Sequence, residues 1–207
     1  MTTTDDASPA GGAPARPGRP GHDQTSVLTI AVEVFNEFGY EATSMGTLAE
    51  RLGTSKSAIY HHFPSKEEVL NQALEYALGG LEAILDDPRS RVGTADLRLR
   101  FVVSEAVRVL CERLPHVTLL LRLRGNTEVE RTALDRRRRF NATVAELVET
   151  AREEGSIRTD VDARTITRLL FGMVNSIVEW YRLDGLTTPG LIADDVLSIA
   201  FDGIRPR

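Results

Sequence analysis

The sequence is poor in the features that mark secreted and membrane-spanning proteins. Cys111 is its only cysteine, which excludes an internal disulfide and fits a reducing compartment. No run of about 18 apolar residues occurs, so no transmembrane helix is expected. The first residues contain no apolar stretch of the kind that a secretory signal has. We therefore expect a cytoplasmic protein with no membrane partner, in which Cys111 is a buried structural thiol rather than a redox sensor.

Positive charge is also scarce. The chain has 25 lysines and arginines against 30 aspartates and glutamates, a net charge of −5. A basic surface is the usual electrostatic sign of nucleic-acid binding, and it is missing here. Because hydroxyls and helix N-termini can hold phosphates without net positive charge, DNA binding stays possible, with weak non-specific affinity and a modest salt dependence.

The residues needed for a catalytic or metal site are missing as well. The sequence has no His-Glu-x-x-His motif, no cysteine pair and no glycine-rich phosphate loop after a strand. His61 and His62 are neighbours, so on a helix they would point about 100° apart, and no suitably spaced carboxylate completes a metal site. We expect no catalytic residues, no metal ligands and no cofactor, and an enzyme is the least favoured class.

Helical spacing of apolar residues is present almost throughout, and period-2 alternation is absent. The fold class is therefore predicted to be all-α, with about nine helices. Residues 1–22 are rich in proline, glycine and alanine and are expected to be a disordered tail. The expected helices cover 24–38, 45–52, 56–61, 66–87, 94–113, 116–123, 127–154 and 162–182, with a last one opening at Pro189.

Residues 43–63 have the pattern of two short helices joined by a tight turn. Ser44 can cap the first, Gly53 can end it with a positive φ, and Ser55 can cap the second. This is a helix-turn-helix pattern, whose second helix fits a DNA major groove; an ordinary pair of packed surface helices is the alternative. The side chains expected at the DNA are Thr43, Ser44, Ser55, Lys56, Ser57, Ala58, Tyr60, His61 and Lys66.

A longer ordered pattern surrounds this motif. It runs Ala31-x-x-x-Phe35-x-x-x-Gly39-Tyr40-x-x-Thr43-Ser44, then Leu48-Ala49-Glu50-Arg51-x-Gly53-x-Ser55-Lys56, then Ile59-Tyr60-His61-x-Phe63-Pro64-Ser65-Lys66-Glu67-Glu68-Val69-Leu70. The block 23–76 resembles the DNA-binding domain of the TetR family of bacterial transcriptional regulators. The resemblance implies a helix-turn-helix domain over 23–68, a helical ligand-binding and dimerisation domain over 69–207, and a homodimer on a palindromic operator in double-stranded DNA.

In that family the last two long helices of each subunit form a four-helix bundle across a two-fold axis. The resemblance therefore implies a dimer interface on the apolar stripes of the two carboxy-terminal helices, and a purely intramolecular core is the alternative. The residues assigned to this interface are Ile166, Leu170, Val174, Val178, Tyr181, Ile192, Val196 and Ile199.

The carboxy-terminal third resembles a narrower branch of the family. The segments Gly155-x-Ile157-Arg158-x-Asp160-x-Asp162 and Asn175-x-x-x-Glu179-Trp180-Tyr181-Arg182-x-x-Gly185 are similar to regulators of fatty-acid, aromatic-acid and steroid-side-chain degradation. Several of these release DNA on binding an acyl-CoA thioester; Leu183 stands where the branch commonly has proline. The resemblance implies a repressor with an acyl-CoA effector, while a regulator of drug efflux that binds hydrophobic drugs and a ligand-independent dimeric DNA-binding module stay open.

An acyl-CoA needs an apolar cavity and cations for its phosphates. Arg136-Arg137-Arg138-Arg139 sweep about 300° on a helix, so at least one points inward and needs an anionic partner. That partner is a ligand phosphate or a structural carboxylate such as Glu128, Glu130 or Glu146. The candidate ligand-binding residues, each of which could equally be core, are Phe101, Arg136, Phe140, Met173, Ile177 and Trp180.

Overall fold

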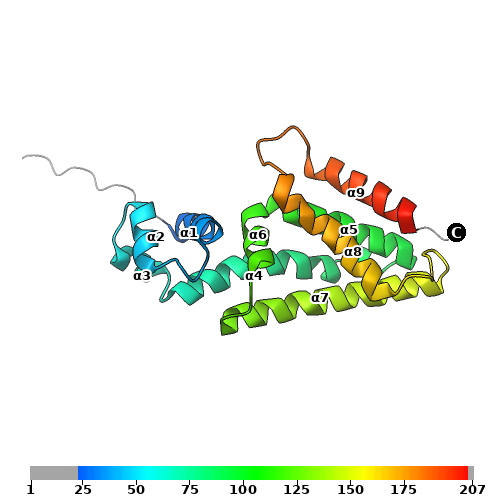
Figure 1. The fold of residues 1–207 in the computed structure, drawn as a ribbon, viewed down its shortest axis with the longest axis horizontal. Coiled ribbons are helices and arrows are strands. Elements are labelled where there is room, and N and C mark those ends of the chain that lie inside the picture. The colour runs from blue at the N-terminus through cyan, green and yellow to red at the C-terminus, as the bar shows by residue number, and fades with distance from the viewer. Residues whose placement is uncertain (1–22, 205–207) are drawn as a thin grey trace, which may run out of the picture.

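The computed structural model describes residues 23–204, and it describes side chains as far as Phe201; the tail predicted for residues 1–22 lies outside this range. Over the described range the chain is helical with no strand, which confirms the predicted all-α class (Figure 1). The elements are α1 (Gln24–Phe38), α2 (Met45–Leu52), α3 (Lys56–His62), α4 (Lys66–Asp86), η1 (Pro88–Ser90), α5 (Ala95–Glu112), α6 (Leu114–Arg122), α7 (Glu128–Glu153), α8 (Ala163–Trp180) and α9 (Pro189–Ile204).

Capping hydrogen bonds and glycine conformation determine where the first helices begin and end. The hydroxyl oxygens of Ser44, Ser55 and Ser65 accept the backbone N–H three residues on, at 3.1, 3.2 and 3.1 Å. Each satisfies a donor that the first helical turn leaves free. Gly53 ends α2 at φ 63°, in the left-handed region that glycine adopts without steric cost. The turn from Gly53 to Ser55 therefore redirects the chain at once from α2 into α3.

The 3-10 turn η1 was not predicted, and two neighbouring residues account for it. Pro88 has no N–H and cannot continue α4. The Asp87 carboxylate accepts the Arg89 N–H at 2.8 Å and so caps the turn that follows. The Arg89 guanidinium and backbone N–H hold the pKa of Asp87 down at about 2.

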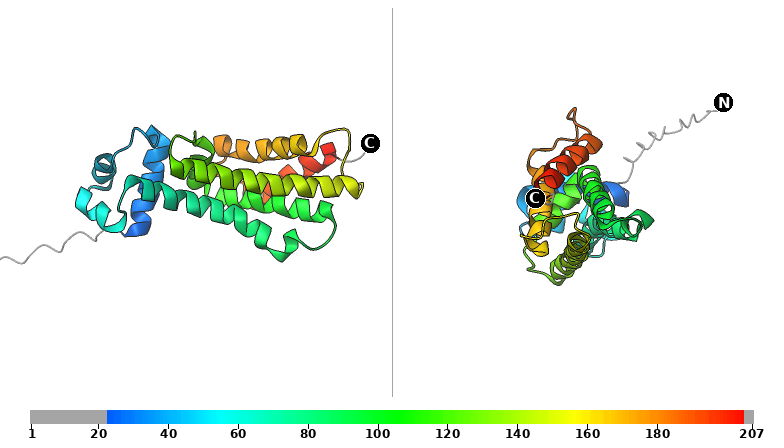
Figure 2. Two further views of the ribbon diagram at one scale, coloured as in Figure 1. Left: turned by 90° about the horizontal axis from the view of Figure 1, so that it is seen from below. Right: turned by 90° about the vertical axis from the view of Figure 1, so that its right-hand side faces the viewer.

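The molecule is elongated, with a small unit at one end and a helical bundle at the other. Helices α1, α2 and α3 form the small unit, and α4 leaves it to run along the bundle formed with α5, α7, α8 and α9 (Figures 1 and 2). The short α6 stands across the long helices and packs against both α1 and α4. Helices α4 and α6 of the bundle therefore both contact α1 of the small unit.

One contiguous cluster of buried apolar side chains extends from α1 to α9. Helix α4 contributes at both ends, with Val69 and Leu70 near its start and Leu78 and Ile84 near its end. The predicted boundary between domains 23–68 and 69–207 therefore falls inside a shared core, and the division stays a prediction. In the described range no helix has both the length and the apolar character needed to cross a membrane.

Candidate nucleic-acid interface and ligand site

The free side of α3 carries the side chains that the sequence predicts at DNA. Ile59 and Phe63 are fully buried and hold the helix against its own domain, while the Tyr60 side chain is 50% exposed. Small and hydroxyl-bearing residues beside a projecting aromatic let a helix come close to base edges and phosphates. The other exposed residues of α3 are Lys56, Ser57, Ala58 and His61. Their contact with DNA stays a prediction.

Two serines that the sequence predicts at the DNA, Ser44 and Ser55, also have a structural role. Ser44 and Ser55 are exposed, and each hydroxyl already caps its helix. Replacement of such a cap costs about 1 kcal/mol, so loss of DNA binding in a serine variant would mix stability with contact. These residues are therefore poor first choices for testing the surface.

Thr43 and Lys66 lie differently from the sequence expectation. Thr43 is buried, and its hydroxyl donates to the Gly39 carbonyl at 2.8 Å. The Lys66 ammonium donates to the carbonyls of Tyr40 and Thr43 at 2.9 and 2.8 Å and lies 4.2 Å from the centre of the Tyr40 ring. Both side chains therefore hold the loop between α1 and α2, and this placement does not favour them as phosphate contacts.

Gly46 shapes the surface, although sequence reasoning missed it. A Cβ atom built on Gly46 would lie 2.8 Å from the Lys56 Cε atom. The end of the Lys56 side chain therefore lies against α2 at Gly46, the one residue of that helix without a side chain. A lone glycine in a helix of eight residues carries no signal that would reveal this contact.

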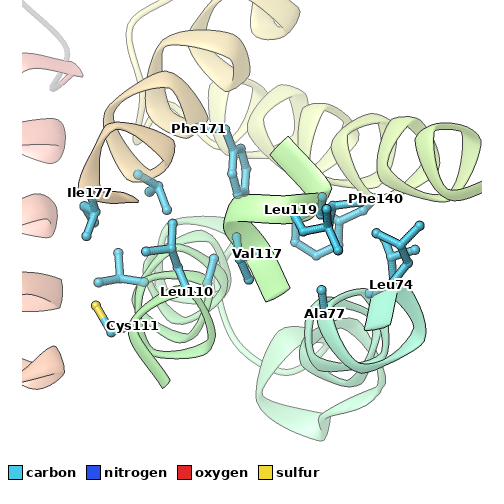
Figure 3. Close-up of a cluster of buried hydrophobic side chains, with 14 of the residues drawn as sticks. Leu74, Ala77, Leu110, Cys111, Val117, Leu119, Phe140, Phe171 and Ile177 are labelled. Atoms are coloured by element: carbon cyan, nitrogen blue, oxygen red, sulfur yellow. The ribbon is translucent and has the colours of Figure 1, made fainter. Parts of the chain in front are cut away.

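The bundle encloses a small apolar chamber of about 30 Å³. Four of its walls come from α5, α6, α7 and α8, where Leu110, Val117, Phe140 and Phe171 gather around α6 (Figure 3). Phe140 and Phe171 meet edge to face, with their ring centres 5.5 Å apart. The complete lining is Leu81, Ala106, Leu110, Val117, Leu120, Leu121, Arg137, Phe140, Phe171, Val174 and Asn175.

An open groove of about 400 Å³ adjoins the chamber on the outside of α6, α7 and α8. Leu121, Arg137 and Asn175 line both spaces and form the boundary between them. Beyond that boundary the polar residues Thr118, Arg122, Ser176 and Glu179 line the groove together with Val178. The two spaces together could take a molecule with a small apolar part and a longer polar part.

Of the ligand-binding residues proposed from sequence, Phe140 alone lines this chamber. Phe101 packs beneath the Arg89 guanidinium, Met173 lines a separate surface groove between α8 and α9, and Ile177 is buried core. Trp180 is about half exposed at the end of α8. Phe171 and Asn175 were missed, and Arg137 was named only as one of four successive arginines, since helical spacing identifies a side of a helix but not which of its residues borders a cavity.

Arg136 has structural partners rather than a free guanidinium. It donates to both carboxylate oxygens of Glu82 on α4, at 2.8 and 2.7 Å, and it also pairs with Glu75. These carboxylates, and not Glu128, Glu130 or Glu146, are its partners. The Arg136 hydrogen bonds lower the pKa of Glu82 and raise that of Arg136. The ion pair joins α7 to α4, so this placement does not favour Arg136 as a ligand contact.

Most residues assigned to the dimer interface are already covered within one chain. Ile166, Leu170, Val174, Tyr181, Ile192 and Val196 are buried in the single subunit and Val178 is partly buried. Helix α5, which packs against both α8 and α9, covers that side. The large apolar side chains that α8 and α9 leave exposed are Leu169 at 67%, Ile199 at 66%, Leu191 and Trp180. Only Ile199 belongs to both sets.

Helix α6 is tied to α1 by two hydrogen bonds at its ends. The Asn36 side-chain amide donates to the Pro115 carbonyl at 2.8 Å, and Arg122 Nη1 donates to the Asn36 carbonyl at 2.8 Å. A cleft of about 580 Å³ lies between the end of α1 and the end of α6. A shift of α6 would therefore act directly on the small unit that carries α3.

Comparison with known proteins identifies the two parts of the chain. Residues 27–73 match the family described as bacterial regulatory proteins, tetR family. Residues 92–204, more than half of the 207, match the tetracyclin repressor-like C-terminal domain. The chain belongs to the TetR family. Members of this family are transcriptional regulators that bind operator DNA as dimers, so the partners of this TetR-family chain are operator DNA and a second copy of itself.

Individual relatives extend over nearly the whole chain. SCO3833, a TetR-family regulator from Streptomyces coelicolor, has a crystal structure that superimposes with a TM-score of 0.81 at 52% identity, covering 86% of this chain and 90% of that one. The transcriptional repressor KstR2 of Rhodococcus jostii is 27% identical over 191 residues, covering 87% of this chain and 90% of the relative. The crystal structure of AibR in complex with isovaleryl coenzyme A and operator DNA has a TM-score of 0.72 at 24% identity, covering 86% and 97%, which shows a common fold.

Proposed function

We propose that this TetR-family regulator is a homodimeric cytoplasmic repressor that leaves a palindromic operator when an acyl-CoA thioester binds between α4 and α8. The observation that carries the proposal is the apolar chamber adjoining a polar groove. A thioester of coenzyme A has the same division, with a compact apolar acyl group joined to a long polar tail that bears phosphates.

The charges around the chamber support an anionic rather than a cationic effector. Its lining contains Arg137 and no carboxylate. A site for cationic drugs would need an acidic group close to the bound cation, because a buried charge requires a partner. The relatives agree with this choice: KstR2 of Mycobacterium tuberculosis is described as a ketosteroid transcriptional regulator, and the structure of AibR contains isovaleryl coenzyme A.

The contacts of α6 supply a route from the effector to DNA. Leu120 and Leu121 of α6 border the chamber, and the same helix is bonded to α1 through Pro115 and Arg122. An effector that moves α6 would shift the small units of the two subunits relative to each other. Recognition helices must be about 34–36 Å apart, or a multiple of this, to enter successive major grooves, so a shift of the small units weakens DNA binding.

One observation favours a second candidate, a ligand-independent dimeric DNA-binding module. The enclosed chamber is far smaller than the roughly 300–1,000 Å³ of ordinary ligand sites. A bundle that serves only to dimerise would have such a filled core. The two candidates differ in one property, namely whether any small molecule changes the affinity for DNA.

Fluorescence anisotropy of the protein on the DNA upstream of its own gene tests the proposal. The labelled DNA is titrated with protein, and the complex is then titrated with short- and long-chain acyl-CoA thioesters, the matching free acids and free coenzyme A. Release by a thioester but not by its separate parts is the expected result. Tight binding that none of these compounds changes would rule out the acyl-CoA effector and favour the ligand-independent module.

A further inference from the structure

The boundary between the chamber and the groove contains a partly buried cation that has no anionic partner among the described residues. The Arg137 side chain is partly buried, and its Nη1 donates a long 3.3 Å hydrogen bond to the Leu120 carbonyl. Within residues 23–201 no carboxylate lies within ion-pair distance of Arg137, although Glu179 lines the same groove. Burial of a charged group is costly unless it is paired and hydrogen-bonded. This guanidinium therefore has donors to spare at the place where a ligand would pass.

The three neighbouring arginines differ from Arg137 either in exposure to solvent or in having an acidic partner. Arg136 is paired with Glu82, and Arg138 pairs with Asp135 at 2.5 Å on the surface. Arg139 is exposed to solvent. Burial, and secondly the Arg138 charge, lower the pKa of Arg137, yet an arginine stays charged in a protein. Arg137 alone of the four thus combines burial, charge and the lack of an acidic partner.

The chamber behind this boundary limits the size of the apolar group that can enter it. The chamber of about 30 Å³ compares with about 10–15 Å³ for one water in the same kind of measure. It therefore has room for a few heavy atoms, and a longer chain would have to separate Phe140 from Phe171. Asn175 stands beside Arg137 at the boundary and adds an amide that can donate to an oxygen.

We infer that Arg137 and Asn175 hold the carbonyl or carboxylate oxygen of a short acyl compound whose apolar end fills the chamber. The shared chemistry is an acceptor oxygen joined to a few carbons, and it occurs both in a short-chain acyl-CoA and in the free short-chain acid. The assignment of a coenzyme A tail to this ligand rests on the function proposed above. The length limit and the role of Arg137 follow from the chamber and its boundary.

A matched pair of variants on one helix tests this site. Arg137→Gln keeps an N–H donor for the Leu120 carbonyl but removes the charge. Arg139→Gln removes the same charge from the exposed side of α7. Isothermal titration of the full-length protein with butyryl-CoA, palmitoyl-CoA, butyrate and free coenzyme A gives the affinities, and a thermal melt confirms that each variant is folded. Asn175→Leu is the second boundary variant, for use if Arg137→Gln does not fold.

Butyryl-CoA is expected to bind more tightly than palmitoyl-CoA. Arg137→Gln should weaken its binding by about 10- to 100-fold, the effect of losing one charged hydrogen bond, with Arg139→Gln within about 3-fold of wild type. Equal effects of the two variants, tighter binding of palmitoyl-CoA, or no binding of either short compound would overturn the inference. Binding of butyrate alone, dependent on Arg137, would keep this site and reject the acyl-CoA function. If a thioester binds and both variants weaken its binding equally, the acyl-CoA function would be kept and the site at Arg137 would be rejected.

Discussion

At the scale of single residues, Tyr60 is the side chain whose position most directly suggests contact with DNA. It projects from α3 about 100° around the helix from the buried Ile59, and it is 50% exposed. Tyr60→Ala should weaken operator binding by about 10- to 100-fold, because a specific contact contributes about 1–3 kcal/mol. Anisotropy on operator DNA measures this, and size-exclusion chromatography should show an unchanged dimer.

Tyr76→Ala is the matched control for Tyr60→Ala. Tyr76 on α4 is exposed to nearly the same extent, 49% against 50%, but it lies in the bundle and contacts His116 and Arg113. Its replacement should leave DNA affinity within about 3-fold of wild type, as expected for a surface change away from the interface. Normal operator binding by the Tyr60 variant would show that the recognition surface lies elsewhere.

Cys111 should make the free energy of unfolding fall as the pH rises. Burial raises the pKa of its thiol from about 9 to about 11. Since the folded-state pKa is the higher one, its contribution to stability is complete below pH 9 and is lost as the pH rises towards 11. The loss should amount to about 2–3 kcal/mol in the free energy of unfolding. Urea unfolding between pH 8 and 11 should show a shallower decline for Cys111→Ala, and parallel curves would contradict this.

At the scale of helices, the beginnings and ends were predictable because they depend on neighbours in sequence. Ser44 and Ser55 cap their helices where the sequence placed them, and the cap is a contact across three residues. The side of a helix that meets another helix depends on distant parts of the chain. The stripe assigned to the dimer on α8 is covered by α5, and sequence periodicity could not show this.

The same limit applies to the ligand site. Four successive arginines must point in different directions, and this much followed from helix geometry. Which of them turns towards α4 and which towards the chamber depends on the rotation of α7 against its neighbours. The choice of Arg136 over Arg137 was therefore open from sequence, and the contacts with Glu82 and with the chamber distinguish them.

Two glycines test the role of backbone conformation in these helices. Gly53 has φ 63° at the end of α2, whereas Gly79 lies inside α4 with open space where a Cβ would be placed. Gly53→Ala should lower the free energy of unfolding by about 1 kcal/mol, and Gly79→Ala should raise it by about 0.5–1 kcal/mol. Urea unfolding measures both. Changes of the same sign would mean that backbone conformation does not control stability at these positions.

At the scale of the whole molecule, dimerisation depends on the apolar side chains that one chain leaves uncovered. Leu169 on α8 and Ile199 on α9 are exposed together beside a groove of about 240 Å³. Leu169→Glu should convert the dimer to a monomer, because it would bury a charge without a partner in the interface. Sedimentation velocity measures the change, and operator affinity should fall with it.

Leu97→Glu serves as the control for the dimer variant. Leu97 on α5 is similarly exposed, 61% against 67%, but it lies on a different helix. The same substitution there should leave the dimer intact. A dimeric Leu169→Glu protein, or a monomeric Leu97→Glu protein, would place the interface on another side of the bundle.

The central claim is that effector binding and DNA binding oppose each other within one molecule. The most direct measurement is the dissociation constant of the operator complex with and without saturating butyryl-CoA, together with that of butyryl-CoA with and without operator. Linkage requires both to change by the same factor, expected at about 5- to 150-fold. Weakening of both by the same factor would establish the coupling between the two sites. An operator affinity that saturating butyryl-CoA leaves unchanged would contradict it.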